Sequence, residues 1–169
     1  MKYLSALILF LLFFPVTLPA QELPDDPTSY YDFWVGEWDL TWTDPNGEEG
    51  TGINLIEKTL DGKVIQEHFE ALSGQLAGFK GTSISVYNPS NGWHQAWADN
   101  NGGYIDLHGL TDGTKRIFQT KEQVTTQGTS MSRMVFYDIS KDSFTWDWEA
   151  SSDGGKTWKL SWRIYYVRR

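Results

Sequence analysis

Residues 143–168 read SFTWDWEASSDGGKTWKLSWRIYYVR, with apolar and polar residues alternating on both sides of a glycine pair. Alternation with a period of two predicts a β-hairpin that has one apolar and one polar face. We expect a three-residue loop at 153–155, because this length brings tryptophan opposite apolar residues. The expected apolar pairs are Ala150 with Trp158, Trp148 with Leu160 and Trp146 with Trp162, and the polar pairs are Glu149 with Lys159 and Asp147 with Ser161.

The rest of the chain repeats this pattern of short apolar-rich runs separated by turn pairs. Six pairs favour hairpin turns: Asn46-Gly47, Asp61-Gly62, Asn91-Gly92, Asn101-Gly102, Asp112-Gly113 and Asp153-Gly154. They predict strands at 36–44, 51–60, 63–71, 80–88, 93–99, 104–111, 114–120, 129–139, 143–151 and 156–168. Because closure removes the exposed edges of such a meander, we predict an all-β, about ten-stranded antiparallel up-and-down barrel. A β-sandwich is the alternative.

The N-terminus has the layout of a secretory signal peptide. Lys2 is followed by an apolar run from Tyr3 to Phe14, and the segment ends at Ala20. The run is shorter than a membrane span, and no cysteine follows it to accept a lipid. We therefore predict a signal peptide at 1–20, a polar leader at 21–29 and one domain at 30–169. The mature chain is expected to be periplasmic or secreted, without a membrane span.

Composition excludes several classes of function. The chain has 14 basic and 22 acidic residues, a formal net charge of −8 and no cysteine. An acidic protein repels phosphate backbones, so nucleic acid is not expected as a partner. The lack of cysteine rules out disulfides, thiolate metal ligands and a cysteine nucleophile. We expect a monomer or a homodimer.

The segment Phe33-Trp34-Val35-Gly36-Glu37-Trp38 resembles the start of the lipocalin-like, or calycin, barrels. Tyr30, Tyr31 and Phe33 predict a short helical turn ahead of the first strand. The resemblance implies that Gly36 and Trp38 close the barrel floor against an arginine of the last strand. Arg168 is the candidate, because alternation places it on the same inward face as Trp162. More closely, the chain resembles a bacterial calycin-like family of unknown function. That likeness includes Glu67-His68, residues 93–99 and residues 153–158.

Distantly similar nitrobindin-like barrels bind haem through a histidine near their C-terminal strands. This chain has no histidine after His108, so no cofactor is predicted and haem is kept only as an alternative. Pairing across Asn101-Gly102 sets Trp97 opposite Ile105, Gln95 opposite Leu107 and His94 opposite His108. The two histidines, with Asp106 nearby, are candidate metal ligands, and paired surface histidines are the alternative.

Function is predicted from the inward-facing aromatic residues. They either fill a packed core or line a ligand cavity with polar anchors. The candidate ligand-binding residues are Glu67, Phe69, Gln95, Trp97, Trp146, Trp148, Trp158 and Trp162. We expect a protein that binds a small apolar or amphipathic molecule, and not an enzyme. The first alternative is a calycin-shaped hydrolase or isomerase using Glu67 or a histidine as base. The second is a surface-interaction or envelope-stress protein working through Asp147 and Glu149.

Overall fold

The chain folds into a closed antiparallel β-barrel, as the turn pairs predict. The computed structural model describes residues 22–126 and 128–169, so the predicted signal peptide lies outside the described residues. The strands are β1 (Gly36–Thr43), β2 (Glu49–Thr59), β3 (Val64–Ala71), β4 (Lys80–Asn88), β5 (Gly92–Asp99), β6 (Tyr104–Asp112), β7 (Lys115–Gln119), β8 (Gln123–Thr125), β9 (Gly128–Tyr137), β10 (Ser143–Ser151) and β11 (Lys159–Arg168).

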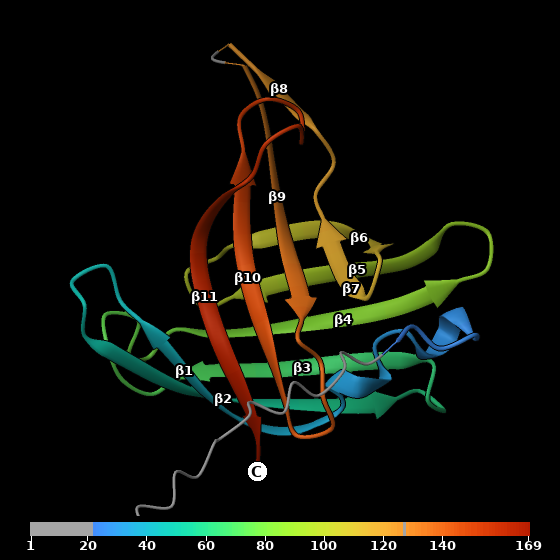
Figure 1. The fold of residues 1–169 in the computed structure, drawn as a ribbon, viewed down its shortest axis with the longest axis horizontal. Coiled ribbons are helices and arrows are strands. Elements are labelled where there is room, and N and C mark those ends of the chain that lie inside the picture. The colour runs from blue at the N-terminus through green and yellow to red at the C-terminus, as the bar shows by residue number, and fades with distance from the viewer. Residues whose placement is uncertain (1–21, 127) are drawn as a thin grey trace, which may run out of the picture.

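Ten of these strands form one up-and-down barrel, in which β7 pairs with β9 and β1 pairs with β11. In Figure 1, β9, β10 and β11 cross steeply in front of β3 to β6, as expected for strands tilted around a barrel axis. The single sheet closes on itself, which excludes the sandwich alternative. The unpredicted β8 pairs with β9, at the end of the barrel drawn uppermost in Figure 1.

The registers of the central hairpins are confirmed, whereas the register of the last hairpin is corrected. Trp97 lies opposite Ile105, Gln95 opposite Leu107 and His94 opposite His108. In the last hairpin Trp146 lies opposite Ile164 and Trp148 opposite Trp162, with a bulge between Trp148 and Glu149. Up to Trp148 the pairing is two residues away from the predicted one, because the loop is longer than three residues. Beyond the bulge it is one residue away, with Glu149 opposite Leu160 and Ala150 opposite Lys159. An even shift leaves Trp146, Trp148 and Trp162 on the same face of the sheet.

The longer loop has a local cause in the side chain of Asp153. Its carboxylate accepts hydrogen bonds from the backbone N–H groups of Lys156 and Thr157 (3.0 and 2.9 Å) and from the Thr157 hydroxyl (2.7 Å). These bonds hold residues 152–158 in a wide turn, so β11 begins at Lys159 and not at 156. Trp158 therefore lies in the loop. Its ring lies 4.1 Å from the Arg133 guanidinium carbon.

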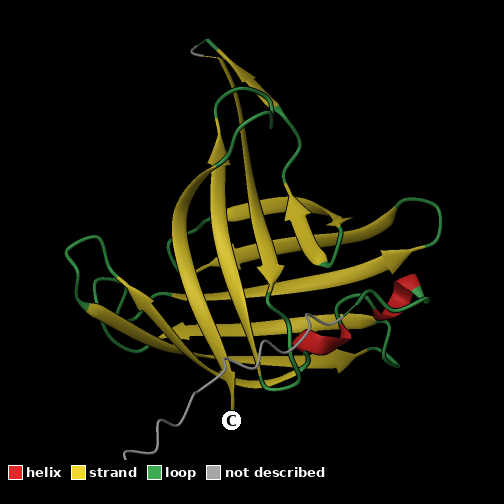
Figure 2. Cartoon of the chain, in the orientation of Figure 1, coloured by secondary structure: helices red, strands yellow, loops and turns green. Residues whose placement is uncertain are grey.

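Short helices cover one end of the barrel. The helices η1 (Pro27–Ser29) and η2 (Asp32–Trp34) precede β1, which confirms the predicted helical turn, and Figure 2 shows them together at this end. Tyr31 stacks on Phe118 with ring centres 4.3 Å apart, and its hydroxyl donates to the Ile117 carbonyl (2.9 Å). The indole of Trp93 donates to the Pro27 carbonyl (2.8 Å). The segment expected to be a polar leader is thus packed onto the barrel.

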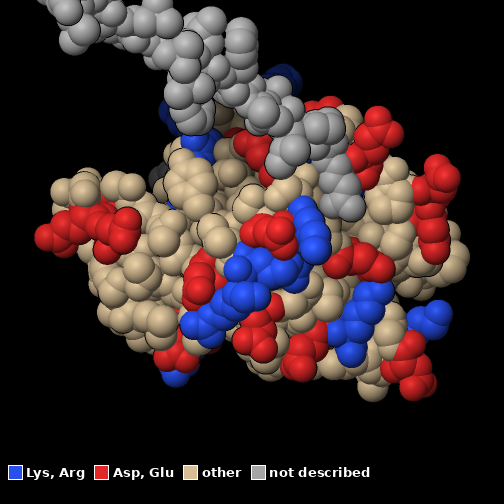
Figure 3. Space-filling view, turned by 60° about the horizontal axis from the view of Figure 1, so that its bottom comes forward, with Lys and Arg blue, Asp and Glu red and all other residues tan. Residues whose placement is uncertain are grey.

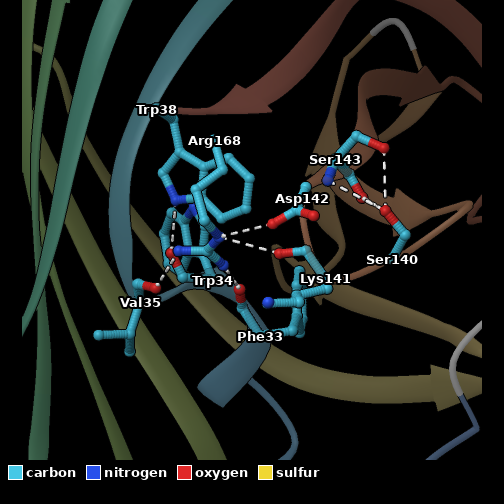
Figure 4. A network of polar contacts seen from close by, with 9 residues as sticks. All are labelled: Phe33, Trp34, Val35, Trp38, Ser140, Lys141, Asp142, Ser143 and Arg168. Atoms are coloured by element: carbon cyan, nitrogen blue, oxygen red, sulfur yellow. Dashed lines mark hydrogen bonds and ion pairs between the residues drawn. The ribbon is translucent and has the colours of Figure 1, made fainter.

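Trp38 and Arg168 meet at this same end (Figure 4). The Arg168 guanidinium carbon lies 4.1 Å from the centre of the Trp38 ring, and the indole is fully buried. The guanidinium also donates to the backbone carbonyls of Val35 (3.0 Å), Phe33 (3.2 Å) and Lys141 (2.9 Å). Gly36 has a φ of 139°, and a Cβ there would collide with the Arg168 side chain. Glycine is therefore required two residues before Trp38.

The outer surface is charged but not of one sign. On the face shown in Figure 3, acidic and basic side chains lie side by side. Asp147 pairs with Arg163 (2.7 Å) and Glu149 with Arg133 (2.6 Å), both pairs being formed between neighbouring strands. Among the described residues, no helix has the length and apolar character needed to cross a membrane.

Candidate binding site

A cavity of about 210 Å³ lies within the barrel, in the half away from Trp38 and Arg168. Its walls are inward-facing side chains of β3, β5, β6, β9, β10 and β11, together with Phe79 just before β4. The lining residues are Glu67, Phe69, Phe79, Trp97, Asp99, Ile105, Leu107, Met134, Trp146, Trp148, Trp162, Ile164 and Tyr166. The lining is mostly apolar and contains two carboxyl groups.

Small residues on strand β4 lie behind the aromatic lining. The strand turns Gly81, Ser83 and Ser85 inward, opposite Asp99, Trp97 and Gln95 of β5. A Cβ at Gly81 would overlap the Trp97 indole, so the ring lies directly against the backbone of β4. Ten strands also enclose more volume than the eight that side chains can just fill. The large rings therefore pack against one another without closing the interior.

The aromatic rings of the lining form a continuous arc. Phe79 and Trp97 have ring centres 6.4 Å apart, and Trp97 and Phe69 are 6.3 Å apart. Phe69 meets Trp162 edge to face at 6.0 Å, and Trp162 meets Trp146 in the same way at 5.6 Å. Trp146 and Trp148 lie nearly parallel, 6.3 Å apart. Edge-to-face contacts stabilise aromatic pairs beyond the burial of their surface, so each ring is held by its neighbours.

Glu67 is the polar group of the inner wall. One of its carboxyl oxygens accepts a hydrogen bond from the Asn54 amide (2.7 Å) and the other accepts one from the Ser83 hydroxyl (2.6 Å). The Asn54 amide also donates to the Tyr166 hydroxyl (3.2 Å). Burial raises the pKa of Glu67 to about 7, although the bonds from Ser83 and Asn54 act in the opposite direction. The carboxyl group therefore changes its charge near neutral pH.

Three buried polar atoms near this network have no hydrogen-bond partner within residues 22–126 and 128–169. They are the side-chain oxygens of Asn54 and Gln95 and the indole nitrogen of Trp162. Leaving such groups unpaired is costly. Of the three residues, Trp162 lines the cavity, whereas Asn54 and Gln95 do not.

Asp99 is the second carboxyl group of the lining, and it is held at the turn after β5. It accepts hydrogen bonds from the backbone of Gly103 (3.0 Å), the indole of Trp97 (3.2 Å) and the backbone of Asn101 (2.9 Å). The bond from Gly103, with the smaller effects of Trp97 and Asn101, lowers the pKa of Asp99. This carboxylate is therefore ionised at neutral pH.

The structure brings together six of the eight candidate ligand-binding residues: Glu67, Phe69, Trp97, Trp146, Trp148 and Trp162. Trp158 does not line the cavity, because the wide loop at Asp153 removes it from the inward face. Gln95 is buried and donates to the Ser85 hydroxyl (2.9 Å), but it lies beside an adjoining groove. Tyr166 lines the cavity but was not among the predicted residues, although it lies on the same face of its strand as Trp162. Phe79 carried no such signal, since it precedes its strand.

The adjoining groove has a volume of about 770 Å³ and shares Ile105, Leu107 and Trp148 with the cavity. Strand β6 pairs with β7 only over His108–Asp112. The groove lies beside the first half of β6, which has no partner in β7. The other side of the groove is formed by Thr120, Lys121, Gln123 and Ser132. The side chains of Ile105, Leu107 and Trp148 thus border both the groove and the cavity.

His94 and His108 lie on this groove, opposite one another on the outer face. The His94 ring contacts the Asn91 carbonyl at 3.2 Å. Desolvation, and then the nearby charges of His94 and Lys121, lower the pKa of His108. In the part of the chain that the structure describes, no group of three or more His, Asp or Glu side chains is placed to hold a metal ion. Lys121 also disfavours a cation at this position.

Comparison with known proteins gives a limited result. No protein-family model and no curated protein matches the chain. Among solved structures, it is similar to a redesigned β-barrel, with a TM-score of 0.44 and 9% sequence identity over 82% of this chain and 93% of that chain. It is also similar to a de novo designed fluorescence-activating β-barrel, with a TM-score of 0.43 and 13% identity over 84% of this chain and 98% of that chain. The class that the fold and the cavity define is a closed antiparallel up-and-down β-barrel with an internal cavity.

Proposed function

We propose that the protein is an exported binding protein that holds one small apolar or amphipathic molecule inside the barrel. The observation that carries this proposal is the aromatic cavity with a buried carboxyl group on its inner wall. A concave, mostly apolar site with a few convergent polar groups is the usual form of a small-molecule site.

The size of the cavity limits the occupant. At about 210 Å³ it is larger than the roughly 150 Å³ that holds benzene. It is smaller than the roughly 300–1,000 Å³ of sites for drug-sized ligands. A molecule with one ring or two fused rings, carrying one polar group, fits these limits.

A cavity-filling variant tests the proposal. Ile105→Trp places an indole in the cavity, whereas Leu160→Trp adds the same group on the exposed side of β11, where Leu160 is half exposed. With indole and 2-naphthol as probes in calorimetry, we expect wild type and Leu160→Trp to bind and Ile105→Trp to lose at least about tenfold in affinity. Wild-type protein that binds neither probe, or equal binding by Ile105→Trp, contradicts the proposal. A circular dichroism spectrum checks that each variant is folded.

Export is part of this proposal and has its own measurement. The predicted signal peptide at 1–20 supports it. Expression of the full chain in a bacterium should yield a periplasmic product whose intact mass lacks these residues. A cytoplasmic product of full mass contradicts export without affecting the binding proposal.

The enzyme alternative is supported by one feature, the pKa of Glu67. A carboxyl group in a cavity with a pKa of about 7 is suited to act as a general base near neutral pH. If the protein is a hydrolase or isomerase, an activity found on a broad substrate panel should disappear in Glu67→Gln while the fold is retained. Activity that survives this substitution excludes Glu67 as the base. The surface alternative has less support, because Asp147 and Glu149 are already paired with arginines.

A further inference from the structure

We infer that the preferred occupant of the cavity is a small organic ammonium ion, an apolar body bearing one protonated amine, with the amine at Glu67. This inference rests on the proposed binding function and names the chemical class of its ligand. Its first support is the sign of the charged residues that line the cavity. Glu67 and Asp99 are its charged residues, and no lysine, arginine or histidine occurs in the lining, all of which lies in the described residues.

The aromatic arc is the second support. The face of an indole ring carries partial negative charge and attracts a cation within about 6 Å, most strongly where water is excluded. Four tryptophans line the cavity, at Trp97, Trp146, Trp148 and Trp162. These rings favour both parts of such a ligand. Its apolar body is buried against them, and its ammonium group is attracted to their faces. A carboxylate or phosphate ligand is repelled by the same rings and by both carboxyl groups.

Hydrogen-bond acceptors at the inner wall are the third support. A protonated primary amine has three N–H donors and no acceptor. Each Glu67 oxygen accepts one hydrogen bond from the protein and retains capacity for a second. The side-chain oxygen of the neighbouring Asn54 is also buried and unpartnered, but Asn54 does not line the cavity. An amine at Glu67 therefore meets acceptor capacity on the two carboxyl oxygens that the protein leaves unused.

Binding of a cation is coupled to the proton on Glu67. Tyr166 faces Glu67 from β11, and its pKa is raised by burial, so it stays neutral and contributes no charge. Ser83 of β4 and Asn54 of β2 do not titrate, Asp99 of the lining is ionised, and His68 points to the opposite face of β3. A bound ammonium favours the ionised form of Glu67, whose pKa in the free protein is about 7. Below that pH, binding must release a proton, so the affinity for the amine rises with pH.

Three ligands that share one skeleton test the inference. They are 2-phenylethylamine, 2-phenylethanol and 3-phenylpropionate, measured by calorimetry at pH 6 and pH 8. We expect the amine to bind about tenfold more tightly than the alcohol at pH 8, because one charge-assisted hydrogen bond is added, and the carboxylate to bind weakest. From pH 6 to pH 8 the affinity for the amine should rise by up to about tenfold, while the affinity for the alcohol stays constant. In buffers of different ionisation enthalpy, binding of the amine at pH 6 should release close to one proton.

Substitutions on β3 provide the matched control. Glu67→Gln should remove both the advantage of the amine and its pH dependence while leaving the affinity for the alcohol within about threefold, because the amide keeps the size of the side chain. Glu70→Gln, which changes an outward carboxylate paired with Lys80, should leave all three affinities unchanged. An amine that binds no better than the alcohol overturns the inference and leaves the binding function standing. If none of the three binds, the inference falls, and the titrations with indole and 2-naphthol decide whether the binding function falls with it.

Discussion

Arg168 shows how much one side chain contributes to the closed end of the barrel. It lies over the Trp38 ring and donates to the carbonyls of Phe33 and Val35, in and after η2, and of Lys141, between β9 and β10. A planar guanidinium can stack and donate in several directions together, whereas a lysine ammonium cannot. The calycin resemblance implied an arginine partner for Trp38 in the last strand, and the position of Arg168 on the same face as Trp162 selected Arg168 among the arginines there.

Arg168→Lys should therefore destabilise the protein although the charge is kept. We expect a loss of about 2–3 kcal/mol in the free energy of unfolding, from the lost stacking and the unpaired carbonyls. Urea denaturation followed by circular dichroism measures it. The control is Arg169→Lys, which alters an exposed pair with Asp39 and should change stability by less than about 0.5 kcal/mol. Equal effects of the two substitutions would show that Arg168 acts only as a charge.

Glu67 makes stability depend on pH in a defined direction. Burial raises its pKa from 4.5 to about 7, so the folded state holds this proton more tightly than the unfolded state does. The contribution of Glu67 to stability is therefore complete below pH 4.5 and is lost as the pH rises through 7. Glu67→Gln should be more stable than wild type at pH 8, and this advantage should shrink by about 2–3 kcal/mol at pH 5. A difference that stays constant between these pH values would contradict a raised pKa.

At the scale of elements, the sequence predicted most strands and the central registers, because Asn-Gly turns and a period of two specify which residues face each other. It did not predict the register of β10 with β11. In that hairpin the Asp153 carboxylate accepts hydrogen bonds from the backbone of its own loop. Alternation of apolar and polar residues does not predict how many residues such a loop contains. The short strand β8 was missed for a similar reason, since three residues are too few to show a period.

The contact of Gly81 with Trp97 gives a prediction for strand β4. In most strands, replacing glycine by alanine stabilises the protein, because the unfolded chain loses freedom. Here the added methyl group would overlap the Trp97 indole, so Gly81→Ala should cost about 1–3 kcal/mol and weaken binding of 2-naphthol. Ile84→Ala, on the exposed side of the same strand, should leave the free energy of unfolding and the affinity for 2-naphthol unchanged within experimental error. Urea denaturation and calorimetry distinguish the two variants, and a stabilised Gly81→Ala would refute the packing argument.

At the scale of the whole molecule, the barrel is asymmetric along its axis. One end is filled by Tyr31, Trp34, Trp38, Phe118 and Phe136, which are at most 1% exposed, whereas the other half holds the cavity. The sequence indicated that aromatic residues point inward, but both a solid core and a hollow one satisfy that pattern. Whether the core is solid or hollow depends on the number of strands in the barrel and on the small residues of β4. Neither the enclosed volume nor the packing against β4 can be read from the order of residues along the chain.

Four of the nine tryptophans line the cavity. The wavelength of indole emission depends on the polarity of its surroundings, and an adjacent electron-rich or electron-poor ring can quench it. A ligand bound in the proposed site would therefore alter the intrinsic light emission of the protein. The chain carries its own optical signal of occupancy, which can be followed in a crude extract without attaching a dye.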